Sequence, residues 1–122
     1  MKVNEQSRRD AEAVAFSGFL AYKSRFAFTA LANHLERWSG DFFTHLLMGD
    51  IAGEFEKMYP IDSEMLEFLK ILDAELASGT EGARGLIKTG FIEELTFGRP
   101  ETLEFLAGFP NLDNCFRKYF GL

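Results

Sequence analysis

Apolar and polar positions alternate with helical spacing along most of the chain, and residues 62–78 show this most clearly. Four apolar residues in this segment follow the i, i+4, i+7, i+11 spacing that places side chains on one helix face: Met65, Leu69, Leu72 and Leu76. Asp62 is a suitable N-cap, and Gly79 is typical of a helix end. Ile61 can pack on Leu66 and fix the entry of the chain. The pattern therefore predicts a helix over 62–78.

A second helix is predicted over residues 81–96, with Thr80 as its cap and Gly98 after its end. Its inner face is expected to carry six small or apolar residues: Ala83, Leu86, Ile87, Gly90, Phe91 and Leu95. Pro100 is well placed in the first turn of a further short helix, over 100–107. After this helix, Asn111 is expected to cap the last one, over 112–120.

The N-terminal third, residues 8–37, is helical in composition, but its apolar residues form two stripes that are out of phase. One stripe holds Phe28, Leu31, Leu35 and Trp38, and the other holds Ala15, Phe19 and Tyr22. We expect two helices that meet near residues 22–25, with one kinked helix as the alternative. Residues 39–41, Ser-Gly-Asp, are expected to begin the helix that follows.

Length and composition agree with one helical domain. The chain has 122 residues, 47% of them hydrophobic, which is enough to build a core. Each of the three prolines, Pro60, Pro100 and Pro110, falls between periodic segments, and no turn signal joins two alternating stretches. The sequence therefore predicts an all-α fold over residues 1–122, a single-domain bundle of about six or seven helices.

The cysteine count and the apolar segments favour a cytoplasmic protein. Cys115 is the only cysteine, so the chain has neither an internal disulfide nor a Cys-x-x-Cys metal site. No apolar segment is long enough to span a membrane. The most apolar stretch, residues 13–22, follows Asp10 and Glu12, where a signal peptide would carry positive charge, so we expect a buried helix there.

Two glycines interrupt a helical pattern at residues 45–55, which read HLLMGDIAGEF. Gly49 and Gly53 are four residues apart and therefore lie on one side of the helix, although each costs about 1 kcal/mol against alanine. Gly90 is a third small residue in an apolar stripe. We expect these glycines to be packing notches that Phe side chains from neighbouring helices fill; the alternative is that they line a ligand pocket.

Candidate catalytic groups are few. His45, Asp50 and Glu54 would be the ligands of a metal site, but the chain contains neither the Glu-x-x-His motif of di-iron bundles nor a His-Glu-x-x-His motif. Cys115 is expected to be core material, because buried free cysteine is common. No Gly-x-Ser-x-Gly nucleophile motif occurs. We therefore expect a protein that is not an enzyme and that has no catalytic residues, no metal and no cofactor.

Charge is distributed unevenly. The net charge is −6, which argues against a general nucleic-acid binder and against attachment to anionic lipid. Residues 41–104 alone hold 14 acidic and 5 basic side chains, a net charge of −9. Such a surface either keeps the domain soluble or docks a basic protein. The candidate docking residues are Asp50, Glu54, Glu64, Glu67, Ile71, Glu75, Glu93 and Glu94, with Ile71 expected as an exposed apolar anchor among the carboxylates.

Residues 45–96 resemble a bacterial family of small, uncharacterised, all-helical proteins found near polymorphic toxin systems. The resemblance is carried by an apolar run that ends in Gly49-Asp50, then a Leu-rich helix, then a helix that ends in residues 91–95, Phe-Ile-Glu-Glu-Leu. The size, acidity and lack of catalytic residues are similar to those of immunity proteins of contact-dependent growth inhibition.

The resemblance implies an immunity protein, an antitoxin that binds a cognate basic toxin domain, expected to be a nuclease, and occludes its active site. Acidic side chains would stand where the phosphates of the nucleic acid would lie. The alternative is a helical ligand-binding or regulatory module that acts as a homodimer, with the glycines lining a small apolar pocket. Neither hypothesis involves direct contact of this chain with nucleic acid or with a membrane.

Overall fold

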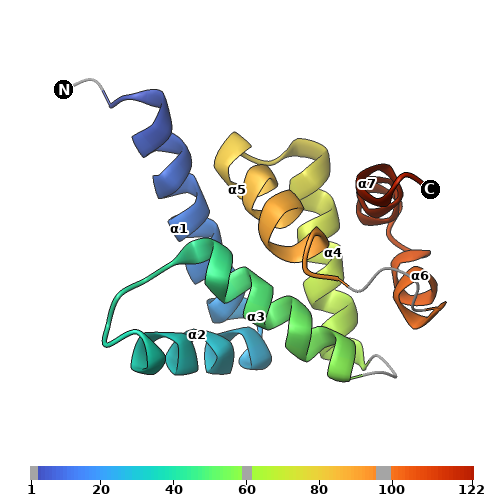
Figure 1. Ribbon diagram of the computed structural model, residues 1–122, viewed down its shortest axis with the longest axis horizontal. Coiled ribbons are helices and arrows are strands. Elements are labelled where there is room, and N and C mark those ends of the chain that lie inside the picture. Colours follow the sequence, from blue (N-terminus) through green and yellow to red (C-terminus); the bar gives the residue numbers. More distant parts are fainter. Residues whose placement is uncertain (1–2, 59–61, 96–99) are drawn as a thin grey trace.

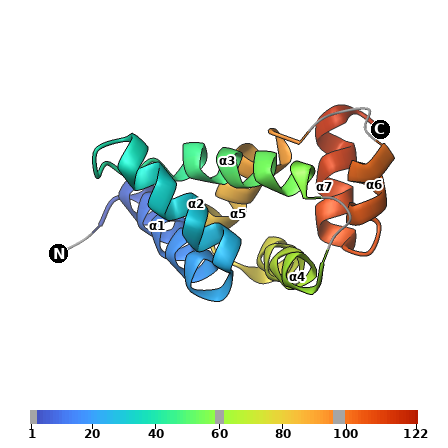
Figure 2. The ribbon, with the colours of Figure 1, turned by 90° about the horizontal axis from the view of Figure 1, so that it is seen from below.

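The computed structural model describes residues 3–58, 62–95 and 100–122, and these form an all-α bundle without any β-strand (Figure 1). In chain order the helices are α1 (Glu5–Lys23), α2 (Arg25–Arg37), α3 (Thr44–Lys57), α4 (Ser63–Ser78), α5 (Glu81–Leu86), the π-helix η1 (Ile87–Ile92), α6 (Pro100–Leu106) and α7 (Pro110–Phe120). The predicted fold class is confirmed. Figures 1 and 2 show α1 and α2 at one end of the bundle, and α6 and α7 at the other.

The N-terminal third forms two helices rather than one kinked helix, and Ser24 is the joint between them. Its backbone is extended, its N–H donates to Leu20 at the end of α1, and its hydroxyl oxygen accepts from the Ala27 N–H in the first turn of α2. One serine thus serves as the C-cap of α1 and the N-cap of α2. The predicted meeting point within residues 22–25 is confirmed.

The two apolar stripes predicted in this region are not the buried faces. On α1 the core side is made of Ala13, Phe16, Ser17, Leu20 and Ala21. By contrast, Tyr22 is 84% exposed and Phe28 on α2 is 60% exposed. Ser17 is tolerated in the core because its hydroxyl donates to the Ala13 carbonyl in the preceding turn. These helices carry more apolar residues than one face can bury, so periodicity alone does not identify the inner face.

Residues 39–41 do not begin a helix, contrary to the prediction. Ser39 and Gly40 have positive φ angles of 53° and 89°, which end α2. The Gly40 N–H donates to the Leu35 carbonyl at 2.7 Å, a bond that closes a helix C-terminus. Helix α3 begins only at Thr44.

The caps predicted for the next two helices are confirmed. Asp62 accepts from the Met65 N–H at 2.9 Å, and the Thr80 hydroxyl accepts from the Ala83 N–H at 3.3 Å. All six residues predicted for the inner face of 81–96 are buried: Ala83, Leu86, Ile87, Gly90, Phe91 and Leu95. The regular helix ends earlier than predicted, because α5 continues as η1 and stops at Ile92. Ile61 and Gly98 lie outside the described residues.

Helix α6 begins at Pro100 as predicted, but Asn111 does not cap α7. Asn111 lies inside that helix, whose N-cap residue, Phe109, has no side-chain cap bond. The cap comes from α4: Asp73 accepts from the backbone N–H groups of Asn111 at 2.8 Å and of Leu112 at 3.0 Å. A carboxylate 38 residues away in the sequence replaces the local side chain that the pattern suggested.

Two other helix N-termini are bound in the same way. Glu64 of α4 accepts from the N–H of Arg25 at 2.6 Å and of Phe26 at 3.3 Å, at the start of α2. Glu12 of α1 accepts from the Gly82 N–H at 2.9 Å, at the start of α5. The first N–H groups of a helix lack partners within it and carry its positive dipole end, so a carboxylate there is doubly favoured. We refer to Glu12, Glu64 and Asp73 as the inter-helix caps.

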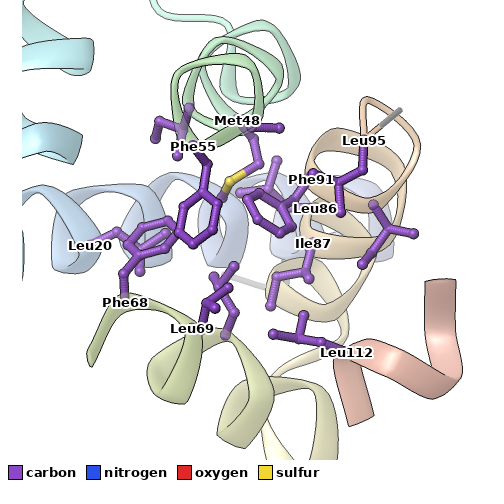
Figure 3. Close-up of a cluster of buried hydrophobic side chains, with 14 of the residues drawn as sticks. Leu20, Met48, Phe55, Phe68, Leu69, Leu86, Ile87, Phe91, Leu95 and Leu112 are labelled. Atoms are coloured by element: carbon purple, nitrogen blue, oxygen red, sulfur yellow. The ribbon is translucent and has the colours of Figure 1, made fainter. Parts of the chain in front are cut away.

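Phenylalanine rings form the centre of the core (Figure 3). Phe55 of α3 lies 5.9 Å from Phe91 of η1 and 4.9 Å from Phe105 of α6, between ring centroids. Phe68 of α4 lies 4.8 Å from Phe26 of α2. Aromatic pairs at such separations add to the stabilisation that burial alone gives. The rings connect five helical segments: α2, α3, α4, η1 and α6.

The glycines differ in what they do. Gly90 is a packing notch, since a Cβ there would stand 2.8 Å from Met48 Cβ; Met48, not a Phe, fills it. At Gly49 a Cβ would lie 3.2 Å from Glu94 Cγ and 3.8 Å from the Gly90 carbonyl oxygen. These two glycines let α3 and η1 cross closely. Gly53 is not a notch, because a Cβ there would meet nothing within 4 Å.

We predict that Asp73→Ala lowers the free energy of unfolding by about 1 to 2 kcal/mol, because two N–H groups at the start of α7 lose their acceptor. Urea unfolding followed by circular dichroism measures the change. The matched control is Glu67→Ala on the same helix, where the exposed carboxylate pairs only with Lys70 and a change within about 0.5 kcal/mol is expected. Equal stability of the two variants would contradict the proposed role of the cap.

Candidate functional site

The eight predicted docking residues do not form one surface. Asp50 and Glu54 lie on α3, while Glu64, Glu67, Ile71 and Glu75 lie on α4. Figure 2 shows α3 and α4 on opposite sides of the bundle, with α5 between them. A partner with one flat contact area therefore reaches one of the two groups and not both.

Much of the α4 group is engaged within the fold. Glu64 is an inter-helix cap for α2, and Glu75 accepts from the Thr80 N–H at 3.1 Å. Ile71 is half-buried and packs against the core, so it is not the exposed anchor that the sequence suggested. Glu67 remains exposed and pairs with Lys70 at 3.3 Å. Of this group, only Glu67 presents its carboxylate without a structural task.

Glu93 and Glu94 follow η1 and point to different surroundings. The Glu94 side chain packs against Gly49 on α3. Glu93 borders a hollow near the C-terminal helix, together with Lys88, Cys115 and Lys118. Glu93 and Glu94 therefore belong to different surfaces, and of the two only Glu94 lies near the α3 residues.

A groove between α2 and α3 holds the remaining predicted residues, Asp50 and Glu54. Its volume is about 610 Å³. Helix α2 contributes Phe26, Thr29, Ala30, Asn33 and Arg37, and the α3 side contributes Gly49, Asp50, Gly53, Glu54, Lys57 and Met58. The side chains of Asp50 and Glu54 are 45% and 56% exposed, so both carboxylates are accessible to a partner. We call this feature the α2–α3 groove.

His34, which the sequence analysis did not single out, lies beside Asp50 of this groove. Its side chain is fully buried, and its Nε2 accepts from the Phe43 N–H at 3.0 Å. In a neutral imidazole with an accepting Nε2, the proton is on Nδ1. That Nδ1 has no hydrogen-bond partner in the described part of the chain and lies 4.0 Å from the Asp50 carboxylate. The ring is held in place by Phe42, Phe43 and Trp38.

The predicted metal ligands are not brought together as a set. Asp50 and Glu54 share the groove, whereas His45 borders a different hollow, beside Val14 and Phe43. Within residues 3–58, 62–95 and 100–122, no group of three or more His, Cys, Asp and Glu side chains could hold a metal ion. No helix in the described ranges combines the length and the apolar character needed to cross a membrane.

Sequence reasoning missed that α1 and α2 expose large apolar side chains. Four of them are more than two-fifths exposed: Val14, Phe19, Tyr22 and Phe28. Tyr22 and Phe28 border one hollow, and Val14 borders another. Lys23 stands over two of these rings, 5.8 Å from the centroid of Phe19 and 5.9 Å from that of Tyr22. The two out-of-phase stripes in the sequence were the available signal, because apolar residues in excess of one face must end on another.

Comparison of the chain with protein families, with curated proteins and with solved structures finds no match. The functional argument therefore depends on the geometry of the chain itself.

Cys115 is half-buried near Lys88 and Lys118. Burial raises the pKa of its thiol above the ordinary value, and the two lysines oppose this only in part. Because the thiolate is the reactive form, we predict that alkylation by iodoacetamide near neutral pH is slower than that of N-acetylcysteine and accelerates as the pH is raised. Unfolding in urea is expected to remove the difference. A native rate equal to that of the free thiol would contradict the prediction.

Proposed function

We propose that this protein is an immunity protein that binds a cognate toxin domain and neutralises it. The observation that carries the proposal is the α2–α3 groove, where the accessible carboxylates of Asp50 and Glu54 border a recess in a chain of net charge −6. Opposite charge speeds the encounter with a basic partner and fixes its orientation. A nuclease domain has such a basic cleft, because it binds phosphates.

In the proposed mechanism the α2–α3 groove and its rim cover the active site of the toxin. The carboxylates occupy positions that nucleic-acid phosphates would otherwise take, so the substrate is excluded by shape and by charge. The immunity protein acts by binding, without turnover and without a cofactor, in the cytoplasm where an incoming nuclease finds its substrate. Glu94 adds a further carboxylate nearby, since its side chain packs against Gly49, which lines the groove.

The proposal predicts that the protein forms a stable complex with a toxin domain encoded next to its own gene and inhibits its nuclease activity. Asp50→Asn combined with Glu54→Gln is expected to weaken binding at least about tenfold, since each loses a charge at the interface. The matched control is Glu67→Gln on the opposite side, with little change expected. Calorimetry and a nuclease assay measure the two effects.

The proposal fails if no neighbouring gene encodes a toxin domain and no basic protein co-purifies with the chain. If the complex forms but Glu67→Gln weakens it more than the double variant does, the interface is on α4 and the assignment of the groove is wrong.

The exposed rings of Tyr22 and Phe28, which border one hollow, favour a second candidate, a regulatory module that acts as a homodimer. Exposed apolar side chains that gather on a soluble protein mark association sites. This candidate predicts a dimer in sedimentation experiments, and a monomer after Tyr22→Ser combined with Phe28→Ser. Because both side chains are exposed, the variant is expected to keep the helical content of the native protein. A monomeric native protein at high concentration would exclude the candidate.

A further inference from the structure

Gly53 has no structural requirement that explains it. It stands in the middle of α3, where glycine costs about 1 kcal/mol against alanine, yet a Cβ there would meet nothing within 4 Å. Gly49, one turn earlier on the same helix, is different, because a Cβ there would contact Glu94 and Gly90. The absence of a side chain at Gly53 keeps the wall of the α2–α3 groove open.

The basic side chain beside Asp50 is the buried imidazole of His34, 4.0 Å away. None of the lysines and arginines in the described ranges forms an ion pair with Asp50, whereas Glu54 pairs with Lys57 at 3.5 Å. Arg37, at the border of the groove, lies over the Trp38 ring, 5.9 Å from its centroid. Of the two carboxylates in the groove, Asp50 is therefore the one that is not in an ion pair with a lysine or arginine of the described ranges.

His34 is an independent sign that Asp50 has a ligand. Its buried Nδ1 lies 4.0 Å from the Asp50 carboxylate, which is too long for a hydrogen bond. A buried donor without a partner is unfavourable, and a small movement of Asp50 would satisfy it. A cation bound on the other oxygen of Asp50 would hold the carboxylate in place while His34 donates to it from behind.

The other residues that line the groove favour one kind of cation. Asn33 and Thr29 add polar side chains, while Phe26, Ala30 and Met58 add apolar surface. A guanidinium group has five donors in a plane and an aliphatic stem, so it can bond a carboxylate and an amide oxygen at once while its stem lies on apolar atoms. An ammonium group, a strongly hydrated point charge, uses such a wall less well.

We propose that the α2–α3 groove binds an arginine side chain of the partner protein, with Asp50 as the carboxylate that pairs with the guanidinium, Gly53 as the open wall and His34 as the residue that positions Asp50. This inference rests on the proposed immunity function, because it names the group of the toxin that the groove receives. Lys57 and Arg37 also line the groove, and in the proposed complex they meet acidic groups of the partner.

The test titrates the full-length protein with N-acetyl-arginine amide and follows backbone amide shifts by NMR. The amides of Asn33, Asp50 and Gly53 are expected to shift, and the neutral isostere N-acetyl-citrulline amide is expected to leave them unchanged. Asp50→Asn is expected to weaken the binding of the arginine derivative by about tenfold or more. Equal shifts from both compounds, or shifts confined to other carboxylates, would overturn the proposal.

A filled groove supplies the second variant. Gly53→Leu places a side chain in open space, so it is expected to fold and to abolish binding of the arginine derivative. Gly85→Leu is the matched control, since a Cβ at Gly85 also meets nothing within 4 Å and the residue lies outside the groove. If the control weakens binding as much as Gly53→Leu does, the proposal is wrong.

The same variants separate this inference from the proposed function. If a toxin is inhibited by the native protein and equally well by Gly53→Leu and Asp50→Asn, the arginine assignment is wrong and the immunity function stands. If no toxin binds but the arginine derivative binds in the groove and is lost in both variants, the assignment of the groove stands and the immunity function fails.

Discussion

Carboxylates that bind the N-termini of other helices are the interaction on which the arrangement of this bundle depends. Glu12, Glu64 and Asp73 each accept from backbone N–H groups at the first turn of a helix 38 or more residues away. Hydrophobic burial draws the helices together but has no direction. A cap is directional, because its hydrogen bonds and the helix dipole act only at one end of a helix. The caps therefore set which end of α2, α5 and α7 meets α1 or α4.

This use of carboxylates explains why the charge pattern located the site only in part. Counting acids correctly showed an acidic middle segment, and Asp50 and Glu54 do border an accessible groove. Glu64 was counted with them, although it is a structural cap. A carboxylate at helical spacing looks the same in the sequence whether it faces solvent or the first turn of another helix. Only the packing of distant segments distinguishes the two, and periodicity carries no information on it.

The fold was predictable where the signals are local. Spacing and residue type were enough to predict three features: the caps at Asp62 and Thr80, the joint near Ser24, and the inner face of residues 81–96. The cap of α7 and the inner faces of α1 and α2 were not predicted because they depend on contacts between distant residues. The late start of α3 has a local cause, since the positive φ angles of Ser39 and Gly40 end α2 there. His34 is a further example of a feature that was not predicted, because its buried ring accepts a hydrogen bond from the Phe43 N–H, and no sequence pattern predicts that bond.

Helix α3 separates the requirements of folding from those of binding on its two sides. One side carries Met48 and Phe55 into the core and crosses η1 where Gly49 and Gly90 meet. The other carries Asp50 and Gly53, whose side-chain positions contribute no packing to the core and border the groove. Glycine at position 53 lowers the stability of α3 without allowing a closer contact within the fold. This loss is explained if a side chain of a partner protein occupies the space that Gly53 leaves open. A Cβ at Gly18 in α1 or at Gly85 in α5 would also meet nothing within 4 Å, but of these three glycines Gly53 is the one that borders the groove together with Asp50, which is the physical reason to look there for a partner.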